Sequence, residues 1–248
     1  MRYLSVSADA KTVKGEKKGY LTGILYLAPA STSGVANVCA HATPGCMDSC
    51  LNTAGRAGIF PAILVARARK TRELFADRAG FQAGLAKDIE ALRRRAARLG
   101  LTPCVRINGT SDLPWLALAM ADRFPDVQFY DYTKHPAPWT RARANYHLTF
   151  SRSESNDQDC RDALRHGTNV AVVFPVKRGQ ALPDSWQGYP VIDGDVSDLR
   201  FLDDEVKGTN LFPRNRGVVV GLRAKGRAKR DCTGFVVKSE LIQIGAIA

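Results

Sequence analysis

The stretch Tyr20–Ala30 reads YLTGILYLAPA, a short apolar run that ends in Pro and small residues. A run of this length and composition is typical of a buried β-strand that leads into a loop. The stretch Cys39–Arg56, CAHATPGCMDSCLNTAGR, follows shortly after it and contains three cysteines. The sequence therefore predicts a first strand followed by a cysteine-containing loop, which we place at residues 31–60.

Helical and strand-like segments alternate after this loop. Apolar residues recur at spacings of three and four within Pro61–Leu99, with arginines on the opposite face, which predicts helix. Short β-branched runs then alternate with further helical segments as far as Val176. Such alternation predicts βα units around a parallel sheet, open or closed into a barrel, within one α/β domain spanning 1–248. The apolar positions of the long helical stretch are Phe81, Leu85, Ile89, Leu92, Ala96 and Leu99.

The two ends of the chain depart from this alternation. Residues 1–19 are expected to form an N-terminal extension. Beyond Val176 the pattern weakens, and PVIDGD with SDLRFLD indicates an irregular segment that supplies one further strand. Two apolar runs, Gly217–Leu222 and Gly234–Lys238, flank the basic connection RAKGRAKRDCT. This arrangement predicts a basic C-terminal β-hairpin over residues 214–238.

The charge balance favours an anionic partner. The chain has 36 Lys and Arg against 24 Asp and Glu, a formal charge of +12, and Arg214–Arg230 contains seven basic residues and no acid. DNA or RNA is the candidate partner, and a basic surface that is simply solvated is the alternative. Binding without sequence preference is expected, because neither a helix-turn-helix pattern nor an aromatic stacking platform is evident. The candidate nucleic-acid-binding residues are Arg223, Lys225, Arg227, Lys229 and Arg230.

The N-terminus has no apolar segment of the kind a signal peptide needs, and no stretch reaches the length of a membrane span. We therefore expect a cytoplasmic protein with no membrane partner. The sequence does not indicate the oligomeric state. In a reducing cytoplasm the six cysteines are not expected to form disulfides, so metal or cluster binding becomes the leading interpretation.

Three cysteines, Cys39, Cys46 and Cys50, fall within twelve residues. Pro44–Gly45 supplies the sharp turn that thiolates need to surround one cluster, and Cys46 and Cys50 are one helical turn apart. Three thiolates suit a [4Fe–4S] cluster whose fourth iron is open or capped from elsewhere. Cys232 is the candidate fourth ligand, because its polar loop shows no core pattern and Lys229 and Arg230 would favour its thiolate.

Two alternatives to a cluster remain open. Zinc is one, because the same three cysteines with either His41 or Cys232 would complete a tetrahedral set, although the paired CxxC spacing common in zinc sites is missing. Ordinary buried or free cysteines are the other. Cys104 and Cys160 are themselves best explained as small core residues.

Polar segments follow three of the expected strands, where α/β folds place ligands. One of them is Asp131–His135, in which a lone histidine is more often a surface residue than a catalytic one. The other two segments are candidate cofactor sites. The first combines a flexible glycine with hydrogen-bonding groups and a carboxylate, but Ser111 or Asp112 could instead cap the following helix. The second suits a ribose or phosphate, but Ser155, Asn156 or Asp157 could instead cap its own following helix. No phosphate loop or dinucleotide-binding GxGxxG is present. The candidate cofactor-binding residues are Asn108, Gly109, Ser111 and Asp112, and Ser151, Arg152, Ser153 and Glu154.

From Tyr20 to about Val237 the chain resembles the phage "gene product 88" family, through the cysteine loop, the VRINGTSDLPW segment and the GLRAKGRAKRDCTGF tail. This resemblance implies a phage or prophage origin rather than an activity, and with it a location in the host cell cytoplasm. It names neither a substrate nor a reaction.

The order of elements is also similar, more distantly, to the radical S-adenosylmethionine superfamily, in which a cluster-binding cysteine loop follows the first strand of a partial (βα) barrel. This resemblance implies an iron–sulfur enzyme whose open iron binds S-adenosylmethionine. It also implies that the segment Asn108–Asp112 contacts the methionine amino group of that cofactor. The cysteine spacing here, six residues and then three, differs from the usual spacing of that superfamily, three and then two.

Overall fold

The computed structural model describes residues 1–7, 10–207 and 215–237. The segments predicted to be strand or helix between Tyr20 and Val176 are present, with bounds shifted by a few residues at most. The helices are α1 (Ala10–Glu16), α2 (Pro44–Asp48), α3 (Pro61–Ala76), α4 (Arg78–Leu99), α5 (Pro114–Arg123) and α6 (Asp157–Arg165). The 3₁₀ turns are η1 (Leu51–Thr53), η2 (Gly55–Gly58), η3 (Pro138–Thr140), η4 (Arg200–Val206) and η5 (Gly226–Arg230). The strands are β1 (Leu4–Val6), β2 (Tyr20–Leu25), β3 (Thr102–Arg106), β4 (Gln128–Thr133), β5 (Tyr146–Ser151), β6 (Val170–Phe174), β7 (Ser185–Trp186), β8 (Tyr189–Asp193) and β9 (Val219–Arg223).

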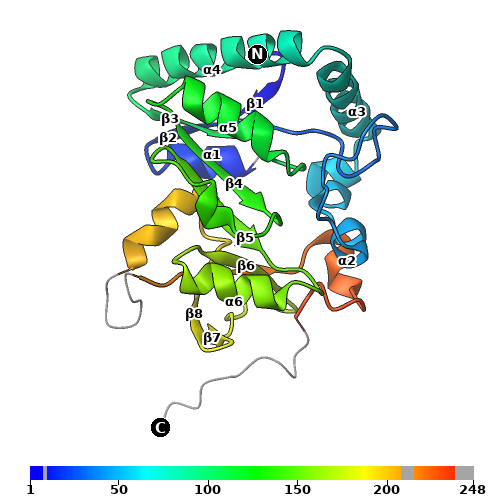
Figure 1. Ribbon diagram of the computed structural model, residues 1–248, viewed down its shortest axis with the longest axis vertical. Coiled ribbons are helices and arrows are strands. Elements are labelled where there is room, and N and C mark those ends of the chain that lie inside the picture. The colour runs from blue at the N-terminus through cyan, green and yellow to red at the C-terminus, as the bar shows by residue number, and fades with distance from the viewer. Residues whose placement is uncertain (8–9, 208–214, 238–248) are drawn as a thin grey trace.

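The strands form one mixed, mostly parallel sheet in the order β1-β2-β3-β4-β5-β6-β9-β8-β7. The pairs from β2 through β9 to β8 are parallel, whereas β1 and β7 are antiparallel to their neighbours at the two edges. The predicted α/β class is therefore confirmed. The sheet formed by the described residues is open. Of the two predicted possibilities, an open sheet or a closed barrel, the closed barrel is therefore wrong. Figure 1 shows α4, α5 and α6 following one another along this sheet.

The predicted helical stretch from Pro61 to Leu99 is two helices that divide at Asp77. The Asp77 side chain accepts a hydrogen bond from the Gly80 backbone N–H at 2.9 Å and caps the start of α4. α4 buries five of its six predicted apolar positions against the sheet, but Leu99 is 55% exposed. Leu99 is the last helical residue, and the left-handed Gly100 ends the helix directly after it.

Neighbouring residues of each strand face opposite sides of the sheet. On β3, Val105 packs in the large core beneath α4 and α5, whereas Cys104 packs with Tyr130 and Leu199 on the other side. The segment that includes η4 covers this second side. Cys160, a residue of α6, is buried in a third cluster between α6 and the sheet. Both cysteines predicted to be core residues, Cys104 and Cys160, are therefore buried.

The predicted C-terminal hairpin is wrong. β9 pairs in parallel with β6 and with β8, and Val236 forms a separate parallel bridge with Val173 of β6. Because Val173 already pairs with Leu222 of β9, Val236 lies on the opposite side of β6, beyond the end of β5. The valines of both runs are buried, so each run takes its own position beside β6 instead of pairing with the other. They are Val218, Val219 and Val220, and Val236 and Val237. Arg214 and Lys238, at the limits of the predicted hairpin, lie outside the described residues.

The predicted N-terminal extension contains an edge strand. β1 pairs with β2, and the Asp88 carboxylate on α4 accepts hydrogen bonds from the backbone N–H groups of Arg2, Tyr3 and Leu4. Within the described residues, no helix is both long and apolar enough to cross a membrane.

Candidate functional site

A cavity of about 390 Å³ lies where the parallel strands end at their carboxyl sides. It brings together the cysteine segment and the polar strand-end segments, which are far apart in the sequence. Parallel strands place the loops that follow them at one edge of the sheet. In Figure 1 the cysteine segment, coloured blue to cyan, lies at one side of the molecule beside the orange segment that follows β9. The predicted site residues that line the cavity are Cys39, Cys46, Cys50, Asn108, Gly109, Ser111, Asp112, Ser151, Arg152, Arg223 and Lys225.

Cys39 is held against the loop that follows β3. Its backbone forms a parallel bridge with Asp112, and its thiol lies 3.8 Å from the Thr110 carbonyl oxygen, to which it donates. The Ala30 N–H donates to the same sulfur at 3.4 Å. Burial raises the pKa of the Cys39 thiol to about 11. The first predicted cysteine and the Asn108–Asp112 segment therefore form one wall of the cavity.

Cys46 and Cys50 are positioned by α2 and η1. Thr43 caps α2 by accepting a hydrogen bond from the Cys46 N–H at 3.3 Å, and Pro44 occupies the first helical position. Cys50 caps η1, and its sulfur accepts from the Asn52 N–H at 3.5 Å. Burial raises the pKa of the Cys50 thiol as well. The predicted turn at Pro44–Gly45 is thus the start of a short helix that directs Cys46 to the cavity.

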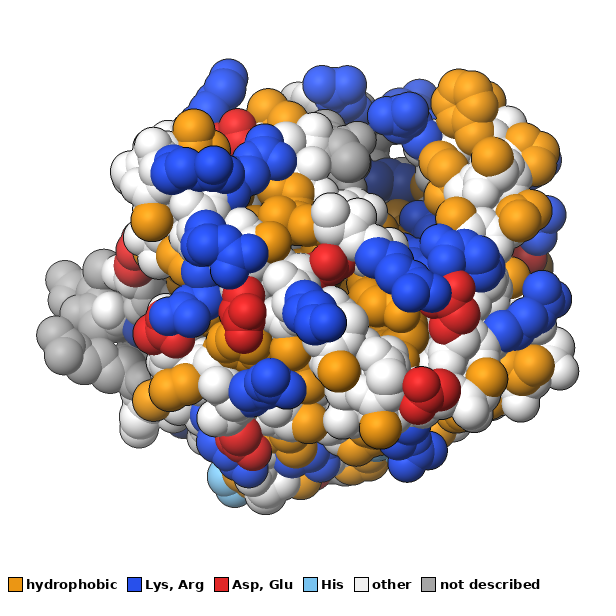
Figure 2. All heavy atoms as spheres, turned by 90° about the horizontal axis from the view of Figure 1, so that it is seen from above, with side chains coloured by type: hydrophobic (Ala, Val, Ile, Leu, Met, Phe, Trp, Pro, Cys, Tyr) orange, Lys and Arg blue, Asp and Glu red, His pale blue; other side chains and the backbone are white. Residues whose placement is uncertain are grey.

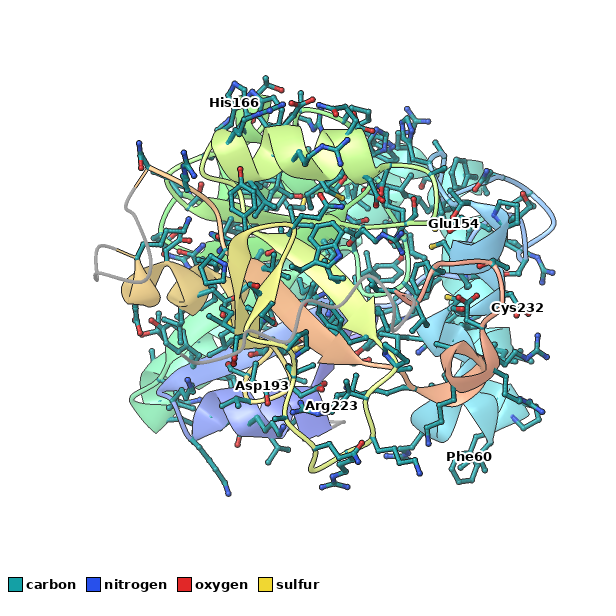
Figure 3. The ribbon with its side chains drawn as sticks, turned by 90° about the horizontal axis from the view of Figure 1, so that it is seen from below. Phe60, Glu154, His166, Asp193, Arg223 and Cys232 are labelled. Carbon is teal, nitrogen blue, oxygen red and sulfur yellow. The ribbon has the colours of Figure 1, made fainter. Side chains whose placement is uncertain are left out.

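Glu154, predicted to bind a cofactor, binds the cysteine segment. Its carboxylate accepts from the Thr43 hydroxyl and from the Gly45 N–H, both at 2.7 Å. A Cβ at Gly45 would lie 2.8 Å from both carboxylate oxygens and closer still to the Thr233 hydroxyl, so only glycine fits there. Figure 3 shows Glu154 on the same side of the molecule as Cys232. Glu154 does not line the cavity, nor does the neighbouring predicted residue Ser153, which is buried.

The Asn108–Asp112 segment is braced from β4. Asn108 donates from its backbone at 2.7 Å and from its side chain at 3.1 Å to the Asp131 carboxyl group, and its own Oδ1 accepts from the Ser111 hydroxyl at 2.9 Å. Asp112 accepts from the Thr133 hydroxyl at 2.9 Å and from the Lys134 N–H at 2.7 Å. The alternative that Ser111 or Asp112 caps α5 is wrong, because the capping residue is Leu113 and no side chain caps it.

Arg152 joins the second polar segment to the segment that follows η5. Its guanidinium donates to the Asp157 carboxylate at 2.9 Å, to the Phe235 carbonyl at 3.0 Å and to the Gly234 carbonyl. The expected capping of α6 by a side chain is not seen, because the capping residue Asn156 accepts instead from the Ser153 N–H at 2.6 Å. Arg152 therefore holds the segment after η5 in place as well as lining the cavity.

The segment after β9 lies over the cysteine side of the cavity. η5 contacts η1, and both Ala228 and Phe235 line the cavity. Cys232 lies between them in sequence, yet it is exposed and is not among the lining residues. Among the described residues, no group of three or more His, Cys, Asp and Glu side chains is arranged to hold a metal ion.

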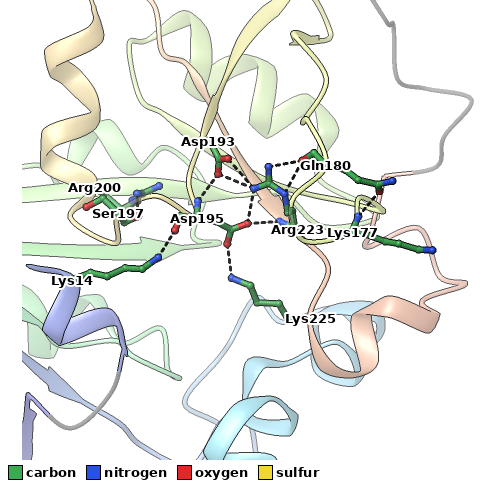
Figure 4. A network of polar contacts seen from close by, with 9 residues as sticks. All are labelled: Lys14, Lys177, Gln180, Asp193, Asp195, Ser197, Arg200, Arg223 and Lys225. Atoms are coloured by element: carbon green, nitrogen blue, oxygen red, sulfur yellow. Dashed lines mark hydrogen bonds and ion pairs between the residues drawn. The ribbon is translucent and has the colours of Figure 1, made fainter.

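The predicted nucleic-acid-binding residues fall into two groups. Arg223 and Lys225 belong to a network with acidic residues, in which Arg223 contacts Asp193 at 2.9 Å and Asp195 at 3.1 Å, and Lys225 contacts Asp195 (Figure 4). The remaining three lie on η5 and are exposed, Arg227 at 3.6 Å from Asp48. These are Arg227, Lys229 and Arg230.

Two polar side chains of the cavity, Asp198 and Ser49, were missed as site elements. Arg106 on β3 donates to the Asp198 carboxylate at 3.1 Å, and both side chains are almost fully buried. The Ser49 hydroxyl, next to Cys50, is buried with no hydrogen-bond partner among the described residues. Asp198 and Ser49 carry no periodic or spacing signal, because only the fold brings them to the strand ends.

Comparison with known protein families shows to which family the chain belongs. A family model described as Gene product 88 matches residues 3–238. The chain belongs to the Gene product 88 family. No curated protein and no solved structure gives a significant match to this Gene product 88 chain. The predicted family is thus confirmed, and the link to radical S-adenosylmethionine enzymes gains no support from the comparisons.

Proposed function

We propose that the chain is an iron–sulfur protein in which Cys39, Cys46 and Cys50 hold a [4Fe–4S] cluster in the cavity at the strand ends. The observation that carries this proposal is that all three thiols line one cavity although no two of them share a helix or strand. Glu154 and the Asn108–Asp112 segment support the cysteine loop from two sides. The unpartnered Ser49 hydroxyl in the same lining also fits a site that takes a further group.

The architecture supports a radical-S-adenosylmethionine-like organisation for this site. Strands β2 to β6 are adjacent in chain order and parallel, as in a (βα) barrel that stays open, and the cysteine segment follows the first of them. A cavity of about 390 Å³ is in the size range of small-molecule sites. S-adenosylmethionine is therefore the candidate small cofactor.

In this proposal the residues that line the cavity bind and orient the cofactor and the substrate. The backbone of Asn108–Asp112, rigidly braced on Asp131, offers fixed hydrogen-bonding groups to the cofactor, and Arg152 closes the opposite side. Arg106 is paired with Asp198 through one guanidinium nitrogen, and its buried Nε has no hydrogen-bond partner among the described residues, so it can donate a hydrogen bond to a bound substrate. A cluster at this position would supply one-electron chemistry.

The experiment is anaerobic purification of the full chain followed by an absorbance spectrum and by iron and sulfide assays. We expect brown protein with a shoulder at about 400 nm, from thiolate-to-iron charge transfer. Colourless protein that contains stoichiometric zinc would support the zinc alternative and refute the cluster.

The second candidate function is sequence-independent binding of DNA or RNA, favoured by the exposed basic side chains of η5. We expect replacement of Arg227, Lys229 and Arg230 by Ala to weaken binding. We expect Arg223→Ala to weaken binding much less, because Asp193 and Asp195 already neutralise its charge. Wild-type affinity should fall by about 0.9 log units per log unit of salt for each duplex phosphate contacted. Absence of gel retardation at low salt would refute this function.

A further inference from the structure

The surface beside the cysteine segment exposes an unusual apolar run. Residues 59–66, IFPAILVA, are eight apolar residues in succession, and all but Ile63 are exposed. Four large side chains dominate this surface, with Ile59 at 70% and Val65 at 69% exposure, Phe60 at 49% and Leu64 at 40%. Folded chains rarely leave so much contiguous apolar surface in water, because its burial is worth about 25 cal/mol per Å². We call these four side chains the apolar face.

The apolar face is next to the proposed cluster site. It begins one residue after η2, η2 contacts η1, and Cys50 caps η1. Two further exposed apolar side chains, Met47 and Leu51, directly follow Cys46 and Cys50 in the sequence. Figure 3 shows Phe60 directed away from the body of the molecule, on the side that carries Cys232. A molecule bound to this face would therefore sit beside the cysteines.

Positive charge borders the apolar face. The Arg56 guanidinium lies over the Phe60 ring, 5.8 Å from its centre, and η5 contributes exposed Lys229 and Arg230. η5 lies in this region, as a Cβ built on Gly226 would come within 2.9 Å of the Ala54 side chain at the start of η2, and η5 also contacts η1. Figure 2 shows hydrophobic side chains gathered at one edge of the molecule with Lys and Arg side chains around them.

We propose that the apolar face docks a small acidic electron-carrier protein. A second copy of this chain is disfavoured, because two such faces would bring like charges together on a chain of net charge +12. A nucleic acid would pair with the cations but would leave the aliphatic side chains in water. An apolar centre containing Phe and bordered by Arg is the usual composition of a protein interface.

The choice of an electron carrier rests on the proposed cluster. One electron passes from the reduced carrier to the cluster and no atom is transferred, so the carrier ends one electron more oxidised. Transient redox complexes use small interfaces whose association is steered by complementary charge. The apolar face, its cationic border and its position beside the cysteines meet each of these requirements.

The test uses the anaerobically purified full chain and, as the probe, flavodoxin of net negative charge. Binding of oxidised flavodoxin is measured by calorimetry at low salt. Cluster reduction is followed by stopped flow with reduced flavodoxin and, separately, with dithionite, which needs no docking surface. We expect Ile59→Ser with Val65→Ser to weaken flavodoxin binding about tenfold and to slow reduction by flavodoxin, while dithionite reduction stays unchanged. Both side chains are mostly exposed, so folding should be little affected.

Charge reversal by Lys229→Glu with Arg230→Glu provides a second variant. We expect it to slow association and to reduce the salt dependence of binding. The matched control is Val196→Ser, because Val196 is 64% exposed and lies between β8 and η4, outside both residues 59–66 and η5. This control should bind flavodoxin as the wild type does.

The docking proposal is overturned if cluster-loaded wild-type protein does not bind flavodoxin, or if neither variant changes binding. It is also overturned if the apolar-face variant instead abolishes self-association in ultracentrifugation or binding to anionic phosphatidylserine vesicles. Failure of the cluster proposal is distinguishable, because it shows as absence of iron and sulfide before any carrier is added.

Discussion

Glu154 accepts a 2.7 Å hydrogen bond from the backbone N–H of Gly45, the residue before Cys46. The same carboxylate accepts from Thr43, so one side chain from the loop after β5 holds the start of the helix that carries a proposed ligand. Two segments separated by more than a hundred residues are thereby coupled. Glu154 is thus a positioning residue for the cysteine segment rather than part of the cavity wall.

Replacement of Glu154 should loosen this helix. Glu154→Ala leaves the Gly45 N–H and the Thr43 hydroxyl without their acceptor, and we expect a loss of about 1–3 kcal/mol in the free energy of unfolding. Iron content per chain should fall with it, and Glu154→Gln should retain part of both. Urea unfolding and iron assays measure these effects. Glu205→Ala, at an exposed position on η4, is the control and should match the wild type.

Gly45 should not tolerate a side chain. The Cβ of Gly45→Ala would collide with the Thr233 hydroxyl and lie 2.8 Å from both Glu154 oxygens, so α2 or the C-terminal segment must move. We expect lower thermal stability and reduced iron content. Adding Thr233→Gly should restore part of both, since it removes the nearest contact. An alanine variant as stable as the wild type would contradict the described packing.

Cys232 should be dispensable for iron binding. The sequence suggested it as the fourth ligand, but its side chain is exposed and does not line the cavity. We therefore expect Cys232→Ser to retain iron and to leave the resonance spectrum of the reduced cluster unchanged. A shift of the wild-type spectrum on adding S-adenosylmethionine would show that the fourth iron is open. Loss of iron in the variant would restore Cys232 as a ligand.

The stability of the loop after β3 should depend on pH through Asp131. Burial raises the pKa of this carboxyl from 3.8 to about 7. A raised folded-state pKa means that the folded chain holds the proton more tightly than the unfolded chain does. The resulting stabilisation is complete below pH of about 4 and is lost as the pH rises towards about 7. Unfolding free energies of the wild type and of Asp131→Asn should differ in this dependence, and parallel curves would contradict it.

Much of the fold could be predicted because local patterns dominate it. The three- and four-residue spacing from Phe81 to Ala96 predicted the buried side of α4, and the apolar Tyr20–Ala30 run predicted β2, which ends at Leu25. The hairpin prediction failed because Val219 and Val236 pair with β6, a choice made by tertiary packing. The residues of the connecting loop carry no information about this pairing.

The site could be predicted only in part. The clustered cysteines and the strand-end loops were found because their spacing and position carry signals, and one cavity joins them. The alternative that Ser111 or Asp112 caps α5 was wrong, because Asn108, Thr133 and Lys134 supply tertiary partners that no local pattern shows. Asp198 was missed for the same reason, since its partner Arg106 lies on a distant strand.

The most direct test of the cluster is electron paramagnetic resonance of dithionite-reduced, anaerobically purified protein at low temperature. The wild type should give the signal of a reduced [4Fe–4S] cluster, and Cys39→Ala, Cys46→Ala and Cys50→Ala should each lose it. Cys104→Ala and Cys160→Ala should keep it, because these buried cysteines do not line the cavity. A signal that survives in all three cavity variants, or a wild type without any signal, would contradict the proposed cluster.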